Sequence, residues 1–216
     1  MDERKICFIM CVNDDAYARE AVWYIRHLKI PDGYHIEWQC IKGASGMAAG
    51  YNEAMKKSDA RYKVYLHQDV MILENDFIEN LLRIFRDPEI GMVGMVGARK
   101  LPENGVMWYA PCMGKVYMTD PCFTWCNALG EVQGEWCPVE MIDGMLMATQ
   151  YDLPWREDLF DGWDFYDASQ SQEFIRHGYK VVVPAMERPW CLHDCGNTNL
   201  HNYWVQRKNL YRNTSK

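Results

Sequence analysis

The sequence has no run of apolar residues that reaches the roughly 18 to 20 residues of a membrane-spanning helix. Residues Met1 to Lys5 lead directly into an apolar segment, and this start lacks the hydrophobic region of a signal peptide. We therefore expect a soluble protein of the cytoplasm without a transmembrane segment.

The sequence also lacks an excess of positive charge. It contains 23 Lys and Arg residues against 30 Asp and Glu residues, a formal net charge of −7. Electrostatic binding of nucleic acid needs a basic face, so we expect no nucleic-acid partner. A nucleotide ligand remains compatible with this balance, because one bound cation reverses the local charge.

Internal repeats and low-complexity linkers are absent as well. A length of 216 residues and a hydrophobic content of 49% suit one α/β domain with its own core. The sequence leaves the oligomeric state open.

Cysteine is present in an odd number, nine residues, mostly among apolar neighbours. In a cytosolic chain this pattern favours free, buried thiols over disulfides. Two pairs, Cys122 with Cys126 and Cys191 with Cys195, have a spacing loosely similar to that of zinc ligands, and the second pair flanks His193. A structural zinc site is therefore the alternative to free thiols.

Strand-like and helix-like segments alternate in the N-terminal part of the chain. Short apolar or alternating runs predict strands over residues 5–12, 35–41, 62–66 and 91–98. Segments with helical spacing lie between them, over residues 15–28, 47–58 and 75–85. This alternation predicts a parallel sheet with helices on both faces.

The character of the sequence changes near Lys100. From there to Glu140, aromatic residues, Gly, Pro and Cys follow no period, which predicts irregular hairpins and loops covering a cleft. An apolar segment follows over residues 141–148. A helix is expected over residues 164–177, ended by Gly178, with a last strand over residues 179–183.

Asp69 lies just after the buried run that ends at Leu66. Ligands of open α/β sheets bind at the carboxyl ends of strands, and a carboxylate there can hold a cation that holds a diphosphate. His193 follows the last expected strand and could reach the same edge. One Asp, one His, two diphosphate oxygens and water would complete an octahedral set. We predict Asp69 and His193 as ligands of Mn²⁺ or Mg²⁺.

Two further groups of polar residues have open alternatives. Asp161, Asp164 and Asp167 stand at the front of the expected helix, where capping explains one acid well and three poorly, and acids also cluster at active sites. Asn13, Asp14 and Asp15 are candidates either for base and ribose contacts or for turn and cap chemistry.

Several Trp residues could stack on sugar rings, with ordinary packing as the alternative. They are Trp108, Trp125, Trp136 and Trp163.

Four stretches together resemble family 2 glycosyltransferases with the GT-A fold, and most closely the small subgroup named after a streptomycin-biosynthesis glycosyltransferase. They are residues 9–13, 46–54, 66–69 and 161–179. The resemblance implies an α/β fold: a GT-A, Rossmann-like open mixed sheet flanked by helices. It also implies a single domain over residues 1–216, with a nucleotide-binding half (1–99) and an acceptor-binding half (100–216).

The resemblance implies roles for individual residues. Asn13, Asn52, His67 and Gln68 would contact the nucleotide-sugar donor, and Asp69 and His193 would bind the metal. Asp167, counted back from Gly178, stands at the position of the catalytic Asp, while Asp143 and Gly144 resemble the acceptor-side loop, joined by Trp163.

Two residues depart from the family pattern. His67 replaces the first acid of the Asp-x-Asp motif, so that only Asp69 carries over as a metal ligand from that motif. Tyr166 replaces the Glu of the Glu-Asp pair, which makes Asp164 a second candidate for the base.

The implied activity is inverting transfer of a sugar, of the hexosyl type, from a nucleoside diphosphate sugar to the hydroxyl of a sugar or glycan acceptor. Two alternatives remain. An inactive nucleotide-sugar-binding protein would also fit the altered acidic motif. A metal-dependent nucleotidyltransferase would normally carry a Gly-rich loop with a basic residue after the first strand, where this sequence has Asn13-Asp14-Asp15-Ala16.

Overall fold

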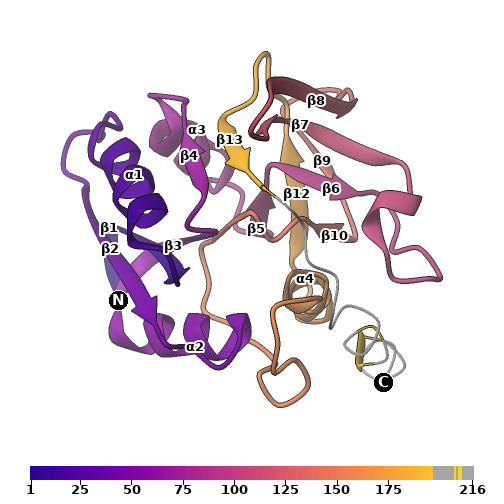
Figure 1. Cartoon of the computed structure of the whole chain (residues 1–216), viewed down its shortest axis with the longest axis horizontal. Coiled ribbons are helices and arrows are strands. Elements are labelled where there is room, and N and C mark those ends of the chain that lie inside the picture. The colour runs from indigo at the N-terminus through magenta and orange to yellow at the C-terminus, as the bar shows by residue number, and fades with distance from the viewer. Residues whose placement is uncertain (197–206, 208, 211–216) are drawn as a thin grey trace.

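The computed structural model describes residues 1–196, 207, 209 and 210. Residues 1–196 contain two β-sheets and four α-helices. In Figure 1 the N-terminal strands and helices lie on the left, and most of the second sheet lies on the right.

The first sheet has seven strands in the order β2-β1-β3-β11-β5-β12-β9. Strand β1 pairs in parallel with β2 and β3, whereas β11 is antiparallel to both β3 and β5. The strands β1, β2, β3 and β5 therefore run in the same direction, as the N-terminal alternation predicted, and the later strand β11 makes the sheet mixed, as the resemblance implied. The strands are β1 (Asp2–Val12), β2 (His35–Lys42), β3 (Ala60–Leu66), β5 (Ile90–Gly94), β9 (Trp136–Pro138), β11 (Leu146–Thr149) and β12 (Lys180–Pro184).

The helices cover the first sheet from two sides: α1 and α3 lie above it in Figure 1, and α2 and α4 lie below. Their bounds are α1 (Asp15–Arg26), α2 (Met47–Lys57), α3 (Phe77–Ile84) and α4 (Tyr166–Arg176), with a short 3-10 helix η1 (Met107–Tyr109). Helix α1 begins where it does because the Asp14 side chain accepts a hydrogen bond from the backbone N–H of Ala16 at 2.7 Å.

The second sheet has the strand order β10-β6-β7-β13-β4, with β8 paired to β7. The strands are β4 (Val70–Ile72), β6 (Val96–Ala98), β7 (Cys112–Thr119), β8 (Thr124–Gly130), β10 (Met141–Ile142) and β13 (Cys191–Asp194). Irregular hairpins and loops were expected here; β7 and β8 do form a hairpin, but the prediction of irregularity is wrong for β7. Its regularity comes from pairing with β6 and with the distant β13, which the local sequence does not reveal.

Three other expectations need correction. The strand expected over residues 91–98 is divided at Met95 into β5 and β6, which belong to different sheets. The helix expected from Asp164 begins at Tyr166, because Phe165 has a left-handed backbone with φ of 61°. His193 lies within a strand, β13, and not in a loop after the last strand.

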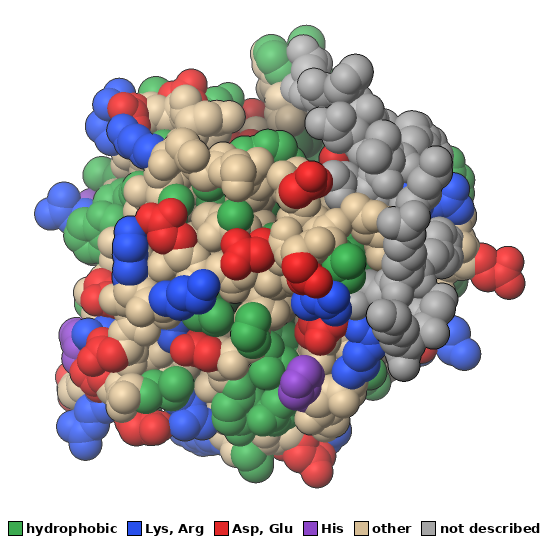
Figure 2. Space-filling model, turned by 90° about the horizontal axis from the view of Figure 1, so that it is seen from below, with side chains coloured by type: hydrophobic (Ala, Val, Ile, Leu, Met, Phe, Trp, Pro, Cys, Tyr) green, Lys and Arg blue, Asp and Glu red, His purple; other side chains and the backbone are tan. Residues whose placement is uncertain are grey.

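Nearly all buried apolar side chains of the described residues form one cluster, with Ile6, Phe8 and Met10 of β1 fully enclosed. None of the helices in the described part of the chain combines the length and the apolarity that a membrane-crossing helix needs. On the face seen in Figure 2, Lys and Arg side chains are scattered among Asp and Glu side chains and gather into no basic patch. The division of function at residue 99 stays a prediction, and residues 197–206, 208 and 211–216 of the second half lie outside the described part.

All nine cysteines are free, as expected. Cys122 and Cys126 are exposed, whereas Cys191 is buried. Among the described residues, the group that could hold a metal ion contains no cysteine. The geometry therefore favours free thiols over the structural zinc alternative.

Candidate functional site

The turn between β3 and β4 carries His67, Gln68 and Asp69. Strand β13 pairs antiparallel with β4 in a register that puts His193 opposite Val70. The backbone N–H of Asp194 donates to the carbonyl of Asp69 at 2.9 Å. The sheet register therefore brings His193 to the carboxyl end of β3, where the sequence predicted that it would meet Asp69.

Three ligand-type atoms converge at this turn. The Oδ1 atom of Asp69 lies 3.5 Å from Nε2 of His193 and 4.0 Å from Nδ1 of His67. The ligand atoms of the three side chains all lie within 4.8 Å of one another. Asp69 Oδ1 is buried and accepts no hydrogen bond of good geometry from the described residues. A buried carboxylate oxygen without a donor beside two imidazoles is a suitable place for a cation.

The three side chains also shift one another's pKa values. Burial alone would raise the pKa of Asp69, but the neighbouring imidazoles of His193 and His67 outweigh it and lower that pKa. Burial would lower the pKa of His193, and Asp69 and Asp143 outweigh it and raise that pKa. For His67, burial and the charge of His193 prevail and lower the pKa. His67 is therefore neutral at neutral pH, the form in which an imidazole binds metals.

Asp167 lies in the first turn of α4. Its Oδ2 accepts a hydrogen bond from the backbone N–H of Gly144 at 2.9 Å, and its Oδ1 accepts one from Ala168 at 2.7 Å. Burial, followed by the negative charge of Asp143, raises the pKa of Asp167 to about 7. A carboxylate with a pKa near neutrality is suited to accept a proton during a reaction.

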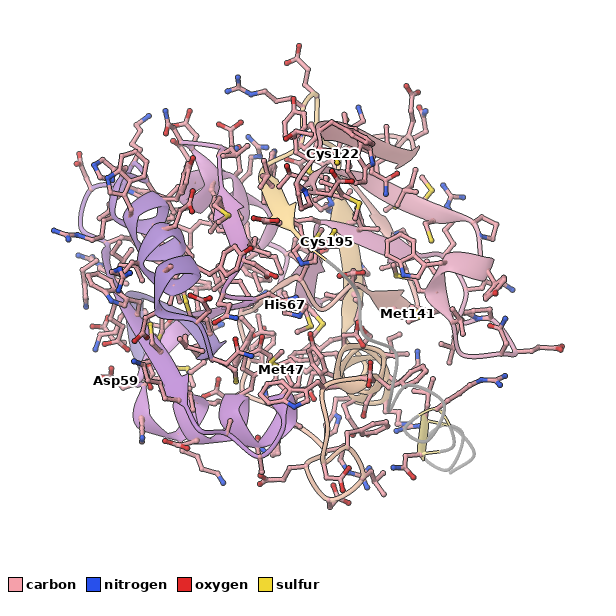
Figure 3. All side chains as sticks on the ribbon, in the orientation of Figure 1. Met47, Asp59, His67, Cys122, Met141 and Cys195 are labelled. Carbon is pink, nitrogen blue, oxygen red and sulfur yellow. The ribbon has the colours of Figure 1, made fainter. Side chains whose placement is uncertain are left out.

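Two adjoining cavities meet beside these residues. The larger, about 370 Å³, is lined by His67 and His193 and by three acids, Asp143, Asp164 and Asp167. The smaller, about 180 Å³, is lined among others by Asn13, Gln68 and Asp69. His67 and Trp163 line both cavities. In Figure 3, His67 lies near the centre of the molecule, between the labelled Met47 and Cys195.

Tyr166, the residue before Asp167, reaches back to the turn after β3. Its hydroxyl lies 2.5 Å from Nε2 of His67. The Tyr166 ring is buried and packs against the rings of Tyr51 and Trp155 at centroid distances of 5.9 and 6.1 Å. The hydrogen bond therefore links the histidine side of the larger cavity to the start of α4.

A family model described as "Glycosyltransferase like family" matches residues 7–213 of the sequence. The chain belongs to this glycosyltransferase family. No curated protein sequence matches the chain significantly.

Solved structures of glycosyltransferases share the fold. One is the mannosyltransferase PcManGT from Pyrobaculum calidifontis in complex with GDP-Man and Mn²⁺, with a TM-score of 0.61 and 14% identity over 98% of this chain and 63% of that chain. Another is S. aureus TarS, with a TM-score of 0.61 and 8% identity over 95% of this chain and 39% of that chain. A third is TarS 1-349 in complex with UDP, with a TM-score of 0.55 and 8% identity over 97% of this chain and 65% of that chain.

This chain spans less than two thirds of the length of each of these structures. At such low identities the likeness concerns the fold alone, and it confirms the mixed α/β fold of GT-A glycosyltransferases.

The residues that resemble the family's donor-binding turn form a small network in this glycosyltransferase-like chain. The Gln68 side chain accepts hydrogen bonds from the backbone N–H groups of Asn13 and Asp14, both at 2.9 Å, and donates one to Asn13 Oδ1 at 2.5 Å. Asp14 caps α1, and Asp15 pairs with Lys42 at 2.6 Å. The geometry favours the cap and turn alternative for these two acids, and leaves Asn13 and Gln68 as cavity-lining candidates.

Asn52, assigned to donor contact by the resemblance, has a structural role. Its side-chain amide donates to the carbonyl of Trp155 at 2.8 Å and accepts from the N–H of Trp155 at 2.9 Å. It is buried and lines neither of the two cavities. The donor contact predicted for Asn52 therefore has no support in the geometry.

Gly144 also has a different explanation from the expected close approach of a sugar. A Cβ atom at this position would lie 2.1 Å from the Tyr166 hydroxyl oxygen and 2.6 Å from the ring carbon that bears it. A larger residue at position 144 would clash with the Tyr166 ring, which explains why glycine fits there. Asp143, Gly144 and Trp163 all line the larger cavity, and their role toward an acceptor stays a prediction.

Sequence reasoning missed the contact between His67 and Tyr166. Both residues depart from the family pattern. Two departures in one chain could have suggested that the two side chains contact each other. Asp164 lies just before α4 and lines the same cavity as Asp167, with its pKa raised by burial, so both acids remain candidates for the base.

Proposed function

We propose that this chain is an inverting glycosyltransferase that moves a sugar from a nucleoside diphosphate sugar to an acceptor hydroxyl. The observation that carries the proposal is the arrangement of the larger cavity. The two imidazoles of a cluster suited to a cation and a buried carboxylate with a pKa of about 7 line the same cavity. Inverting transfer would use them on opposite sides of the anomeric carbon, the cation beside the leaving group and the carboxylate beside the attacking hydroxyl.

Asp69 and His193 would hold the cation. The buried Oδ1 atom of Asp69 supports this assignment, since it makes no hydrogen bond of good geometry with the described residues and a bound cation would satisfy it. A bound Mn²⁺ or Mg²⁺ would offset the charge of the departing diphosphate. The Mn²⁺ and GDP-Man in the similar mannosyltransferase structure are in line with this role.

Asp167 would act as the general base. Its carboxylate takes the proton of the acceptor hydroxyl while the hydroxyl oxygen bonds to the anomeric carbon. The bond from that carbon to the diphosphate oxygen breaks, and the nucleoside diphosphate leaves with the electron pair. Two backbone N–H donors hold the Asp167 carboxylate in place throughout this step.

The smaller cavity would take part of the nucleotide, with Asn13 and Gln68 on its wall. Trp163 stands between the two cavities and is 48% exposed, so its ring is available to a donor or acceptor sugar. Transfer of a hexose, a role in glycan biosynthesis, and membership of the streptomycin-biosynthesis-type subgroup belong to the proposal. So does the cytoplasmic location, which cell fractionation would test.

The experiment that tests the proposal pairs two measurements on the same preparation. Thermal shift with UDP, GDP and dTDP, each with and without Mn²⁺, identifies the nucleotide. A hydrolysis and transfer assay with the matching nucleotide sugars then tests turnover. Metal-dependent binding together with release of the sugar supports the transferase, whereas binding without any release supports an inactive nucleotide-sugar-binding protein. Release of pyrophosphate from a nucleoside triphosphate would support a nucleotidyltransferase.

A further inference from the structure

The two residues that depart from the family pattern touch each other. His67 stands where the family has the first acid of its Asp-x-Asp motif, and Tyr166 stands where it has a Glu. Their side chains are joined by a hydrogen bond of 2.5 Å between Nε2 and the hydroxyl, although 99 positions separate them. Because the two departures contact each other, we interpret them as one change in a single site. That site is the cluster of His67, Asp69 and His193.

We propose that His67 is a third metal ligand, bound through Nδ1 and held in position by Tyr166, so that the site prefers Co²⁺ and Zn²⁺ to Mg²⁺. The inference rests on the proposed function only in placing the cation at the same cluster. It extends the protein's ligand set from Asp69 and His193 to two imidazoles and one carboxylate.

The distances fit a shared ion. Two atoms bound to one ion at about 2.1 Å each are at most about 4.2 Å apart. The Asp69 Oδ1 atom already meets this limit with both histidines, at 3.5 and 4.0 Å. Because all three ligand atoms lie within 4.8 Å of one another, a shift of about half an ångström suffices for all of them to bind together.

The hydrogen bond to Tyr166 engages Nε2 of His67 and leaves Nδ1 as the nitrogen that faces Asp69. A neutral imidazole carries one N–H, and the other nitrogen has a lone pair. With the proton on Nε2, the ring donates to the Tyr166 hydroxyl oxygen and turns the lone pair of Nδ1 toward Asp69. Metal-bound histidines almost always have such a partner on their second nitrogen.

Tyr166 is a fixed support for this bond. Its ring is only 4% exposed, packs against Tyr51 and Trp155, and fills the space left by the missing side chain of Gly144. The hydroxyl therefore cannot move away from His67 without displacing its neighbours. Tyr166 is a positioning residue, since it acts on the metal through His67.

The metal preference follows from the ligand types. Imidazole nitrogen suits Zn²⁺ and other late first-row metals, whereas Mg²⁺ prefers oxygen ligands. Where the family has an acid, His67 supplies an imidazole. The site therefore loses a negative charge that a hard cation needs and gains a nitrogen that a softer cation prefers. His67→Asp should therefore strengthen Mg²⁺ binding and weaken the binding of Co²⁺ and Zn²⁺.

Calorimetric titration of the full chain with Co²⁺, Zn²⁺ and Mg²⁺, without donor or acceptor, tests the proposal, and the visible spectrum of bound Co²⁺ reports the ligands. The wild-type chain should bind Co²⁺ at least about 100-fold more tightly than Mg²⁺, following the usual order of divalent metals at nitrogen sites. His67→Asp should lower this ratio by about tenfold or more and change the Co²⁺ spectrum. Tyr166→Phe should weaken Co²⁺ binding by about 10- to 100-fold, the usual cost of losing such a partner.

Tyr51→Phe is the matched control. It also removes a buried hydroxyl from the same aromatic group, but that hydroxyl contacts the carbonyl of Leu66 and not His67. It should bind Co²⁺ as the wild type does. His67→Gln serves as a second variant if His67→Asp does not fold, and it should lose Co²⁺ affinity without gaining Mg²⁺ affinity.

Wild-type Co²⁺ binding in Tyr166→Phe, or an unchanged ratio in a folded His67 variant, would overturn the proposal. A chain that binds Co²⁺ as expected but transfers no sugar would instead count against the proposed function alone.

Discussion

The imidazole of His67 and the hydroxyl of Tyr166 are hydrogen bonded at 2.5 Å, and this bond joins the two ends of the candidate site. His67 follows β3, where Asp69 also lies, and Tyr166 opens α4, where Asp167 is the next residue. The cation-binding side and the base side of the cavity are therefore parts of one packed unit. The packing of Tyr166 against Tyr51 and Trp155 holds the start of α4 against the turn that carries His67.

Asp167→Asn removes the proposed base while keeping a side chain of the same shape. We expect turnover to fall by about 10²- to 10⁴-fold, because a positioned general base contributes about that much. Nucleotide binding should be unchanged, since Asp167 lines only the larger cavity. Steady-state kinetics with a calorimetric titration checks both. The matched control is Asp164→Asn at the same cavity; if it loses more turnover than Asp167→Asn, then Asp164 is the base.

The pH profile of turnover should rise through about pH 7 and level off above it. A general base acts only when deprotonated, and burial and Asp143 raise the pKa of Asp167 to about 7. Asp143→Asn removes a negative charge that favours the protonated form, so it should move the rise to lower pH. The measurement is kcat/KM from pH 5 to 9 with saturating metal. A flat profile over this range would show that the base has an ordinary carboxyl pKa.

Gly144→Ala places a methyl group 2.1 Å from the Tyr166 hydroxyl oxygen. The buried tyrosine has no room to retreat, so we expect a loss of about 1–3 kcal/mol in the free energy of unfolding, the usual cost of overpacking. Denaturant unfolding measures it. Gly134→Ala is a useful comparison, because no atom lies within 4 Å of its added Cβ and only its positive φ opposes the change. Equal losses in the two variants would contradict the steric explanation.

Trp108→Ala should impair acceptor use more than donor cleavage. Its ring is 52% exposed and lines the larger cavity but not the smaller one. Loss of a stacking surface worth about 1.4 kcal/mol raises the acceptor KM about tenfold. The ratio of transfer to donor hydrolysis measures the effect. An equal fall in both rates would show that Trp108 supports the site as a whole.

The N-terminal elements were predictable from sequence because local patterns determine them. Apolar runs marked β1 and β3, and the acid at position 14 marked the start of α1. The convergence of Asp69 and His193 was predictable as well, since the carboxyl ends of strands meet at one edge of a sheet.

The parts that sequence did not predict depend on distant pairing. Strand β11 enters the first sheet antiparallel between β3 and β5, and β7 gains its regularity from β6 and β13. The bond between His67 and Tyr166 is of the same kind, since 99 positions separate the two residues. Long-range contacts of this sort leave no periodic signal in the sequence around either partner.

The central claim is that Asp69 binds a cation that holds the diphosphate of the donor. Calorimetric titration tests it most directly. The wild type and Asp69→Asn are each titrated, with and without Mn²⁺, with the nucleoside diphosphate identified by thermal shift. The account predicts binding that Mn²⁺ strengthens in the wild type, and loss of that strengthening in the variant, because the buried Oδ1 atom is then no longer part of a carboxylate. Equal affinities with and without Mn²⁺ in the wild type, or the same Mn²⁺ effect in Asp69→Asn, would contradict it.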